Sequence, residues 1–445
     1  MSVKVTMIGG GSSSFVPPLL RNFIESEELR DTRLTLMDVS ADRLETMVKL
    51  AEKLIEAESS PLEVTGMLDQ REALTGADFV IAAISVGGMD AWANDIEIPG
   101  RYGIFMNVAD SIGPGGIFRT LRNAPVQESV ARDVSEVAPG ARIFNYTNPA
   151  AVQALAMLTV PGTLVTSLCS GTQQPSSAAW LAEQAGVEPD LIEMPPIVAG
   201  LNHCTAITEL RLRDGRDGIE LAREVATEPV VKFALETYGV LPYLWPHWTE
   251  FFPQMQRLEQ PYEARAQGLP MRYGITIHDM DKERARVNGL AELAAAWTSP
   301  DAGPIGLADL PPGDEEEGIE VIELMEAIVA NRSEVHVVNA RNEGAIPNLP
   351  DDAVVEVLAE VNGHGVMPLR AGPLPEAFAA HLRQYTAVQK QMVRAALSGS
   401  RLELLRAFML DPMTQAHLDL DQTEAMMDEM LAANAAWLPR FEAAA

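Results

Sequence analysis

The chain has 445 residues, 47% of them apolar, and its 33 Lys and Arg against 63 Asp and Glu give a net charge of −30. This length predicts two closely packed lobes, and the acidic surface argues against nucleic acid or anionic membranes as partners. The sequence shows no basic leader and no apolar run of about 18 residues, and it has two cysteines, so we expect a soluble cytoplasmic protein without a disulfide framework.

The N-terminal residues predict a strand, a glycine turn and a helix. An apolar run at residues 3–8 leads directly into three glycines, and a helical pattern follows at residues 17–30. Such a turn directs backbone N–H groups and the positive end of a helix at one point, which suits a pyrophosphate, although ordinary strand–helix turns share the pattern. We interpret it as a dinucleotide cradle whose cofactor-binding residues are Gly9, Gly11, Ser12, Ser13, Ser14 and Phe15.

A second predicted strand, at residues 33–38, ends in Asp38. A carboxylate at this point can accept hydrogen bonds from both ribose hydroxyls of an adenosine, and it repels a 2′-phosphate. The sequence therefore predicts NAD as the cofactor in preference to NADP. The alternative is that Asp38 only caps the next helix, a role that Ser40 could fill equally well.

Helical and strand patterns continue to alternate beyond this point. A helix is predicted at residues 41–57, and strands are predicted at 62–65 and 78–83. The alternation favours an α/β fold in which residues 1–190 form a Rossmann-type, doubly wound parallel sheet. A glycine turn begins at Ser85, and because ligands bind beyond the carboxyl ends of such strands, we assign Ser85 to the same crevice.

Several further segments place polar residues at predicted strand ends. Residues 107–122 form a constrained glycine–proline loop with a helix from about Ile117, and this loop either lines a ligand site or connects two elements. The predicted strand at 142–149 ends in polar residues, and the predicted strand at 164–169 ends in Cys169. His203 comes later in the chain, at the end of another apolar stretch. Taken separately, a buried Cys is usually inert and a lone His usually structural.

Residues 191–445 are predicted to form a second, mixed α+β lobe for substrate, metal and oligomerisation. An aromatic run at 238–253 contains Tyr243, His247 and Glu250, and it could stack on a sugar or form core. The basic residues that follow are interleaved with acids, which favours a solvated surface. A helix is predicted at 315–330, strands at 335–339 and 353–357, and helices from 376 onward, which suggest a homodimer or homotetramer.

An ordered set of motifs spans nearly the whole chain: IGGGSSSF, the strand ending in Asp38, ADSIGPGGIFRTLR, NYTNP, SLC, GLNH, VNARNEGAIPNLPDD and DPMTQAHLDLDQ. With this set the chain resembles the NAD-dependent glycoside hydrolases of family 4, including their α-galactosidase and uronic-acid glycosidase branch, and it is similar to the related NAD-dependent sulfoquinovosidases. One glycine loop is weak evidence, whereas this set in this order is specific.

The resemblance implies a site and a mechanism. It implies that Cys169 and His203 bind a divalent metal, usually Mn²⁺, and that Asn148 holds sugar hydroxyls with Asp110, a candidate catalytic residue, lining the same pocket. We count Asn145 of the NYTNP motif among the cofactor-binding residues. The resemblance further implies oxidation of the sugar at C3 by NAD, removal of the C2 proton, elimination of the aglycone, addition of water and return of the hydride. The net reaction is hydrolysis of a small glycoside.

The resemblance leaves the base and the sugar open. Tyr243 and His247 are equal candidates for the base, and a phenol would need its pKa lowered. Residues 170–174 depart from the family pattern after the metal-binding cysteine, so a galactoside, a uronide and a sulfoquinovoside are all candidates. An anionic C6 group would need an arginine clamp, for which we name Arg265, Arg272 and Arg286. A dehydrogenase of the lactate/malate type and a non-catalytic NAD sensor are the alternative functions.

Overall fold

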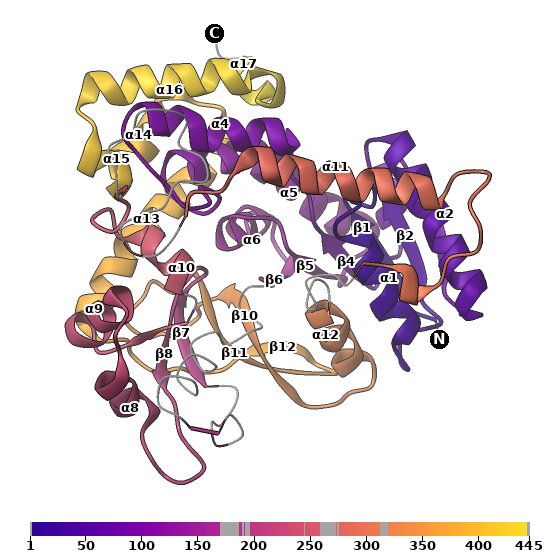
Figure 1. The fold of residues 1–445 in the computed structure, drawn as a ribbon, viewed down its shortest axis with the longest axis horizontal. Coiled ribbons are helices and arrows are strands. Elements are labelled where there is room, and N and C mark those ends of the chain that lie inside the picture. The colour runs from indigo at the N-terminus through magenta and orange to yellow at the C-terminus, as the bar shows by residue number, and fades with distance from the viewer. Residues whose placement is uncertain are drawn as a thin grey trace.

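The computed structural model describes residues 2–169, 187–188, 191, 196–243, 245–258, 273, 276–311 and 319–442. The strands in this part of the chain form one 12-stranded sheet in the order β3-β2-β1-β4-β5-β6-β10-β11-β7-β8-β9, with β12 beside β11 (Figure 1). The strands are β1 (Lys4–Ile8), β2 (Arg33–Met37), β3 (Glu63–Met67), β4 (Phe79–Ala82), β5 (Arg142–Asn145), β6 (Leu164–Ser167), β7 (Ile197–Leu201), β8 (Cys204–Glu209), β9 (Leu241–Pro242), β10 (Glu334–Arg341), β11 (Val354–Asn362) and β12 (Gly365–Pro368).

Helices cover the sheet and build a separate layer at the C-terminus. They are α1 (Val16–Glu25), α2 (Ala41–Glu58), α3 (Gln70–Leu74), α4 (Gly88–Arg101), α5 (Gly113–Val137), α6 (Ala150–Met157), α8 (Gly218–Val225), α9 (Pro229–Thr237), α10 (Trp245–Trp248), α11 (Met280–Trp297), α12 (Ile319–Val329), α13 (Glu376–Ser398), α14 (Arg401–Leu410), α15 (Pro412–His417), α16 (Leu420–Asn434) and α17 (Pro439–Glu442), with short 3₁₀ turns η3 (Thr249–Phe251), η4 (Leu307–Asp309) and η5 (Ala435–Trp437).

The N-terminal half of the sheet is a Rossmann fold, which confirms the predicted class. Strands β3-β2-β1-β4-β5-β6 follow the doubly wound order, and every neighbouring pair is parallel. The central strands are buried and apolar, as parallel strands covered on both faces must be. Because β1 lies between β2 and β4, the strand order reverses at β1, and the glycine turn follows its carboxyl end at the point where such sheets bind ligands.

The sheet continues without interruption into the C-terminal half. Strand β10 pairs antiparallel with β6 through Asn339 and Ser167, and β11, β7, β8 and β9 follow, each antiparallel to its neighbour. The predicted strands at 335–339 and 353–357 are therefore present as β10 and β11. This continuity brings the end of β6 next to the turn between β7 and β8, although 34 residues separate Cys169 from His203. The predicted domain division at residue 190 stays a prediction.

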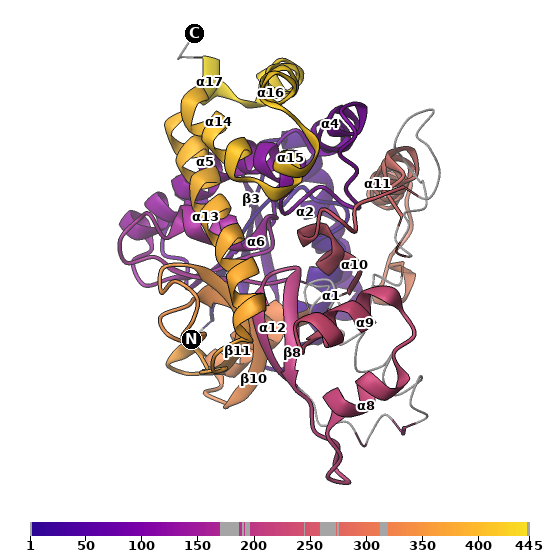
Figure 2. The same ribbon diagram turned by 90° about the vertical axis from the view of Figure 1, so that its left-hand side faces the viewer.

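The C-terminal helices form the predicted helical layer. Helix α13 packs along α5 and α6, and α14 packs against α13 (Figure 2). The largest buried cluster lies between these helices and includes Phe118 of α5, Phe378 and Tyr385 of α13 and Phe408 of α14. Helices α11 and α12 pack against α2 and α1 of the Rossmann half. Within the described residues, no helix combines the length and the apolar character needed to cross a membrane.

Two helix boundaries differ from the sequence predictions. Helix α1 ends at Glu25, because Ser26 has an extended backbone and its hydroxyl accepts a hydrogen bond from the Leu29 N–H. Helix α5 begins at Gly113, four residues earlier than predicted, so the glycine–proline run is its first turn. A Cβ atom at Gly115 would lie 2.7 Å from the Ala109 carbonyl oxygen, so the glycine lets this helix approach the loop that carries Asp110.

Candidate active site

The glycine turn after β1 is held by the ends of β2 and β4. The N–H groups of Gly9 and Gly10 both donate to the carbonyl oxygen of Met37, at 2.9 and 2.7 Å. Gly9 has φ +99°, and a Cβ atom there would lie 2.1 Å from the carbonyl oxygen of Ala83. Only glycine fits this position, so the turn is fixed in shape before any ligand binds.

Asp38 ties this turn to the start of α2. One carboxylate oxygen accepts from the Gly11 N–H and the other from the Ser40 N–H, both at 2.9 Å. Ser40 is the N-cap residue of α2, but its side chain makes no capping hydrogen bond. Each carboxylate oxygen can accept a second hydrogen bond, so these contacts orient Asp38 and still leave it able to bind a ribose.

The other predicted cofactor residues lie around the same strand ends. The Ser12 hydroxyl accepts from the Phe15 N–H at 3.1 Å, Ser13 and Ser14 are half-buried, and Ser85 is exposed. Asn145 is different, because its buried amide bonds Gln127, Thr147 and Ser167. The protein uses both ends of this amide to hold the strand ends together, and the role of Asn145 in cofactor binding stays a prediction.

The two predicted metal ligands meet at the junction of the two sheet halves. Cys169 follows β6, His203 lies in the two-residue turn between β7 and β8, and Cys169 Sγ is 3.4 Å from His203 Nε2. His203 has φ +68°, a left-handed conformation that is uncommon for a residue with a side chain and that concentrates at functional sites. Below the turn, the Glu356 carboxylate accepts from Asn202 and Asn339, each at 2.9 Å, which links the two sheet segments.

A serine and a carboxylate set the orientation of the His203 ring. The Ser111 hydroxyl donates to Asp110 Oδ1 at 2.8 Å, so its oxygen accepts from His203 Nδ1 at 2.7 Å. Nε2 is therefore the nitrogen available to a metal, and such second contacts of a ligating histidine are typical of metal sites. Burial alone would lower the pKa of His203, but the Cys169 sulfur and Asp110 raise it to about 10, so a metal would displace a proton from Nε2.

These two residues fit a divalent metal. A thiolate and an imidazole whose donor atoms are 3.4 Å apart can reach one cation at about 2.1 to 2.3 Å. Within the described part of the chain, no cluster of three or more His, Cys, Asp or Glu side chains could hold a metal ion. The described residues thus offer two ligands to a cation.

Asp110 and Asn148 form the floor beside this pair. Asp110 is 5% exposed, and its Oδ2 accepts from Asn148 Nδ2 at 2.7 Å. Burial alone would raise the pKa of Asp110, but the charges of His203 and Arg119 lower it below its ordinary value, so the carboxylate is ionised at neutral pH. The amide oxygen of Asn148 accepts no hydrogen bond from the described residues, which leaves it available to a ligand.

His247 and Glu250 approach the site from α10 and η3. The His247 ring lies 4.3 Å from the His203 ring, and its buried Nδ1 has no hydrogen-bond partner among the described residues. Burial and the charge of His203 lower the pKa of His247 to about 3. Glu250 accepts from the Val108 N–H through Oε1, its Oε2 has no partner in the described chain, and burial beside Asp110 raises its pKa to about 7.

The remaining predicted residues are Tyr243 and three arginines. The Tyr243 side chain packs in an apolar cluster with Val198, Ile207 and Leu241. Burial, together with the charges of Glu356, Glu320 and Cys169, raises its pKa, which disfavours the phenolate that a base requires. Arg286 is exposed on α11 and bonds Glu283 at 3.1 Å. The predicted clamp residues Arg265 and Arg272, and the segment after Cys169, lie outside the described residues.

Sequence reasoning missed Arg119, a half-buried cation on α5. It is one helical turn from Gly115 and Gly116, which pack against the loop that carries Asp110, and its guanidinium lies 5.8 Å from the Trp92 ring centroid. Among the described residues it forms no ion pair, its Nε has no hydrogen-bond partner, and burial lowers its pKa. Its spacing from the glycines, in the motif GGIFR, was the available signal.

Comparisons with known proteins find relatives over nearly the whole chain. The family 4 glycosyl hydrolase model matches residues 4–178, and the model of the C-terminal domain of that family matches residues 198–414. The chain is 31% identical to an alpha-galactosidase of Rhizobium meliloti over 99% of this chain and 90% of that protein. It is 28% identical to an alpha-galacturonidase of Bacillus subtilis, over 96% of this chain and 97% of that protein.

A solved structure shows the same fold. The 6-phospho-alpha-glucosidase from gut microorganisms, in complex with NAD and Mn²⁺, is 22% identical with a TM-score of 0.78, and the match covers 98% of this chain and 99% of that chain. The two family models together account for most of the residues, and the alpha-galactosidase match extends over nearly all of them. The chain therefore belongs to the family 4 glycosyl hydrolases.

Proposed function

We propose that the protein hydrolyses an unphosphorylated hexoside of the galactoside or galacturonide type, with NAD and one divalent metal, Mn²⁺, as resident catalysts. The carrying observation is the approach of Cys169 Sγ to His203 Nε2 at 3.4 Å, beside the Asp110–Asn148 pair. Membership of a glycosidase family favours this function over a lactate/malate-type dehydrogenase or a non-catalytic NAD sensor.

The Rossmann half supplies the cofactor site in this proposal. The turn at residues 9–15 would face the pyrophosphate and Asp38 the adenosine ribose, which selects NAD over NADP. The structurally similar 6-phospho-alpha-glucosidase was solved in complex with NAD and Mn²⁺, which supports the same pair of ligands here. When bound, NAD supplies a reversible hydride acceptor for sugar C3, and the divalent cation supplies Lewis acidity toward sugar oxygens.

The chain's own residues would orient the sugar and handle protons. Asn148 can hold a sugar hydroxyl through its open amide oxygen, while Asp110 fixes the other end of that amide at 2.7 Å. Ser111 and Asp110 hold His203 with Nδ1 occupied and Nε2 directed at Cys169. This fixed geometry positions a sugar ring without reorganisation during the reaction.

For the base that takes the C2 proton, the geometry favours His247 over Tyr243. His247 lies against the His203 ring, and its Nδ1 has no hydrogen-bond partner among the described residues, whereas Tyr243 packs in an apolar cluster. Glu250, three residues along the chain and with a pKa of about 7, is suited to exchange a proton with the leaving group or with water.

Arg119 favours an anionic or strongly polar substituent on the sugar. The half-buried guanidinium feels the charges of Asp110 and Asp95 but forms no ion pair among the described residues, so a carboxylate or sulfonate of the substrate could pair with it. Arg119 therefore replaces Arg286 as the clamp candidate within the described chain. The α-galacturonide is the second candidate substrate on this ground, and a sulfoquinovoside, which bears a sulfonate at C6, is the third.

We further propose a cytoplasmic enzyme that assembles as a homodimer or homotetramer. Leu402 and Met409 on α14 and Leu420 on α16 are exposed apolar residues on the C-terminal layer, where a second copy could cover them. The molar mass from light scattering coupled to size-exclusion chromatography tests this assembly. A monomer at micromolar concentration would refute it.

The proposed function is tested with nitrophenyl α- and β-galactosides, galacturonides and sulfoquinovosides, each with NAD and Mn²⁺ in deuterated water. We expect turnover of an α-linked galactoside or galacturonide, with deuterium incorporated at C2 of the product. Turnover without deuterium at C2 would contradict the elimination mechanism. Absence of turnover across the whole panel would contradict the proposed substrates.

A further inference from the structure

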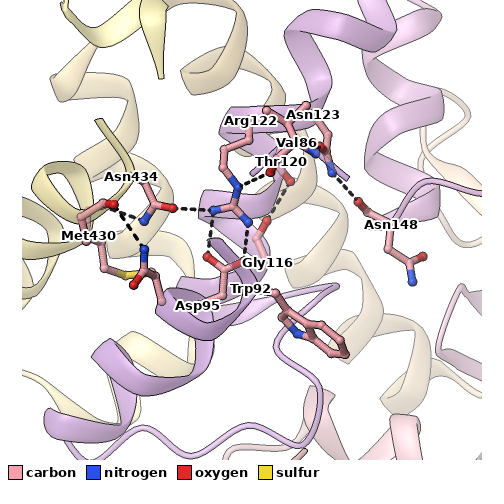
Figure 3. Close-up of polar contacts among 12 residues, drawn as sticks. Val86, Trp92, Asp95, Gly116, Thr120, Arg122, Asn123, Asn148, Met430 and Asn434 are labelled. Carbon is pink, nitrogen blue, oxygen red and sulfur yellow. Dashed lines mark hydrogen bonds and ion pairs between the residues drawn. The ribbon is translucent and has the colours of Figure 1, made fainter. Parts of the chain in front are cut away.

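Two adjacent residues of α5 hold the turn that follows β4. The Arg122 Nε donates to the Val86 carbonyl oxygen at 3.2 Å, and the Val86 N–H donates to Asn123 Oδ1 at 3.0 Å (Figure 3). Both backbone polar groups of Val86 are thus fixed from one helix. These two hydrogen bonds fix the orientation of the turn at residues 85–88, because Val86 cannot rotate when its N–H and its carbonyl oxygen are both bonded.

Arg122 is itself anchored from two sides. Its two terminal nitrogens bond the two Asp95 oxygens, at 2.9 and 2.5 Å, and one of them also bonds the Asn434 amide oxygen at 3.1 Å (Figure 3). The side chains of Arg122 and Asp95 are 2% and 0% exposed. A bidentate buried pair has a defined geometry, so it joins α4, α5 and the end of α16 into a rigid support.

Asn123 connects this support to the sugar side of the site. Its Nδ2 donates to the carbonyl oxygen of Asn148 at 3.3 Å, an oxygen that Gln153 also approaches at 3.4 Å. The Asn148 side chain in turn bonds Asp110 at 2.7 Å. Through Ser111 this path reaches His203, so a continuous series of hydrogen bonds joins the turn at 85–88 to a candidate metal ligand.

We infer that Asn123 is a positioning residue that sets the distance between the cofactor side and the sugar side of the site. The inference rests on the proposed function, in which the turn at 85–88 borders NAD and Asn148 holds the sugar. Asn123 would touch neither ligand. It bonds one backbone group on each side, so its loss lets the two sides shift relative to each other. Misplacement of reacting atoms by about 1 Å costs on the order of 100-fold in rate.

The test compares Asn123→Ala with a matched control, Gln391→Ala. Gln391 is a buried amide that donates to the Glu403 carbonyl oxygen at 2.9 Å, and it joins α13 to α14 away from the site. For both variants and the wild type, kcat, KM, NAD affinity by direct titration, melting temperature and the isotope effect of a C3-deuterated glycoside are measured.

We expect kcat of Asn123→Ala to fall about 10- to 100-fold. The C3 isotope effect should rise, because hydride transfer becomes slower than the other steps. KM and NAD affinity should stay close to wild type, and the melting temperature should fall no further than in Gln391→Ala, whose kcat should not change. A second variant, Asn123→Ser, keeps a polar side chain that is too short to bond both backbone groups, so its kcat should fall by about as much as that of Asn123→Ala.

Equal kcat in Asn123→Ala and Gln391→Ala, or a loss of kcat with an unchanged isotope effect, would overturn the inference. If Asn123→Ala does not fold, the same readouts on Asn123→Ser decide the question. Hydrolysis by the wild type without NAD would refute the proposed function instead. If the wild type shows NAD-dependent hydrolysis and the Asn123 variant is unaffected, the positioning role is refuted and the proposed function stands.

Discussion

The cofactor cradle and the metal corner of this site are built in opposite ways. The cradle comes from residues 4–40, and its N–H groups bond the end of β2 and the Asp38 carboxylate. The metal corner combines residues from the loops after β5 and β6, the β7–β8 turn, α10 and the loop that precedes α5. It contains a left-handed His203 and buried, unpartnered polar atoms of His247 and Glu250 within the described chain.

This difference indicates a division of labour. The cradle is complete without a ligand, as suits a cofactor that stays bound. The corner keeps unsatisfied polar groups, which are costly in a folded protein unless a ligand or the reaction uses them. Binding is thus concentrated in the first region and chemistry in the second, and substitutions in the two regions should separate affinity for NAD from turnover.

The largest expected effect comes from Cys169→Ser. Loss of the thiolate weakens binding of the cation. Because the Lewis acidity of the cation stabilises the transition state by several kcal/mol, kcat/KM should fall at least about 1,000-fold. NAD affinity by direct titration should not change, because the hydrogen bonds that hold the cradle come from Met37, Asp38 and the glycine turn itself. Full activity at saturating Mn²⁺ would contradict the metal assignment, and a parallel loss of NAD binding would contradict the separation of the two regions.

Ser111→Ala should weaken the same corner less severely. The variant keeps both metal ligands and removes the hydroxyl that fixes the His203 ring at 2.7 Å. We expect Mn²⁺ affinity to fall about 10- to 100-fold, as is common when such a supporting contact is lost. Titration of Mn²⁺ followed by electron paramagnetic resonance measures the effect directly, and Ser13→Ala in the cradle is the control. Unchanged affinity would show that Ser111 does not orient the ligand.

Arg119→Met tests the substrate class. If a C6 carboxylate pairs with Arg119, kcat/KM for the galacturonide should fall about 10- to 100-fold, since hydrogen bonds between charged groups contribute about 1.5 to 3 kcal/mol. The neutral galactoside should lose less. Steady-state kinetics on the two substrates with Arg286→Met as control gives the ratio, and equal losses on both would contradict an anion-specific role for Arg119.

Asp38→Ala should act on the cradle alone. We expect NAD affinity to fall roughly 10-fold, because hydrogen bonds to the ribose are lost, and discrimination against NADP should decrease. At saturating NAD, kcat should return close to the wild-type value. A kcat that stays low at saturating NAD would mean that the cradle also shapes the chemistry.

Glu250→Gln should change how stability depends on pH. Burial raises the pKa of Glu250 from 4.5 to about 7, so its stabilising contribution is fully present below pH 4.5 and is lost as the pH rises through 7. Glutamine does not ionise, so the variant does not lose stability in this way. The unfolding free energy of the variant minus that of the wild type should therefore increase by at most about 3 kcal/mol from pH 4.5 to pH 7. Urea unfolding at acidic and slightly alkaline pH measures the difference, and a pH-independent difference would contradict the raised pKa.

The two regions also differed in how well the sequence predicted them. The parallel order and the cradle follow from local patterns, because strand, glycine turn, helix and Asp38 are close together in the chain. Cys169 and His203 could be paired only through the resemblance to a family, since no local pattern indicates that β10 and β11 join β6 to β7. Arg119, Ser111 and Asn123 depend on the close approach of α5 to the Asp110 loop and to the turn after β4, which no local pattern predicts.

The stoichiometry of NAD decides whether the bound nucleotide is a catalyst or a consumed substrate. The metal-loaded protein is supplied with excess glycoside and with NAD at a small fraction of the glycoside concentration, and released aglycone and net NADH are both followed. We expect many molecules of aglycone for each NAD, no accumulation of NADH and no hydrolysis when NAD has been removed. One NADH formed for each product molecule, or undiminished hydrolysis without NAD, would contradict the catalytic role of NAD.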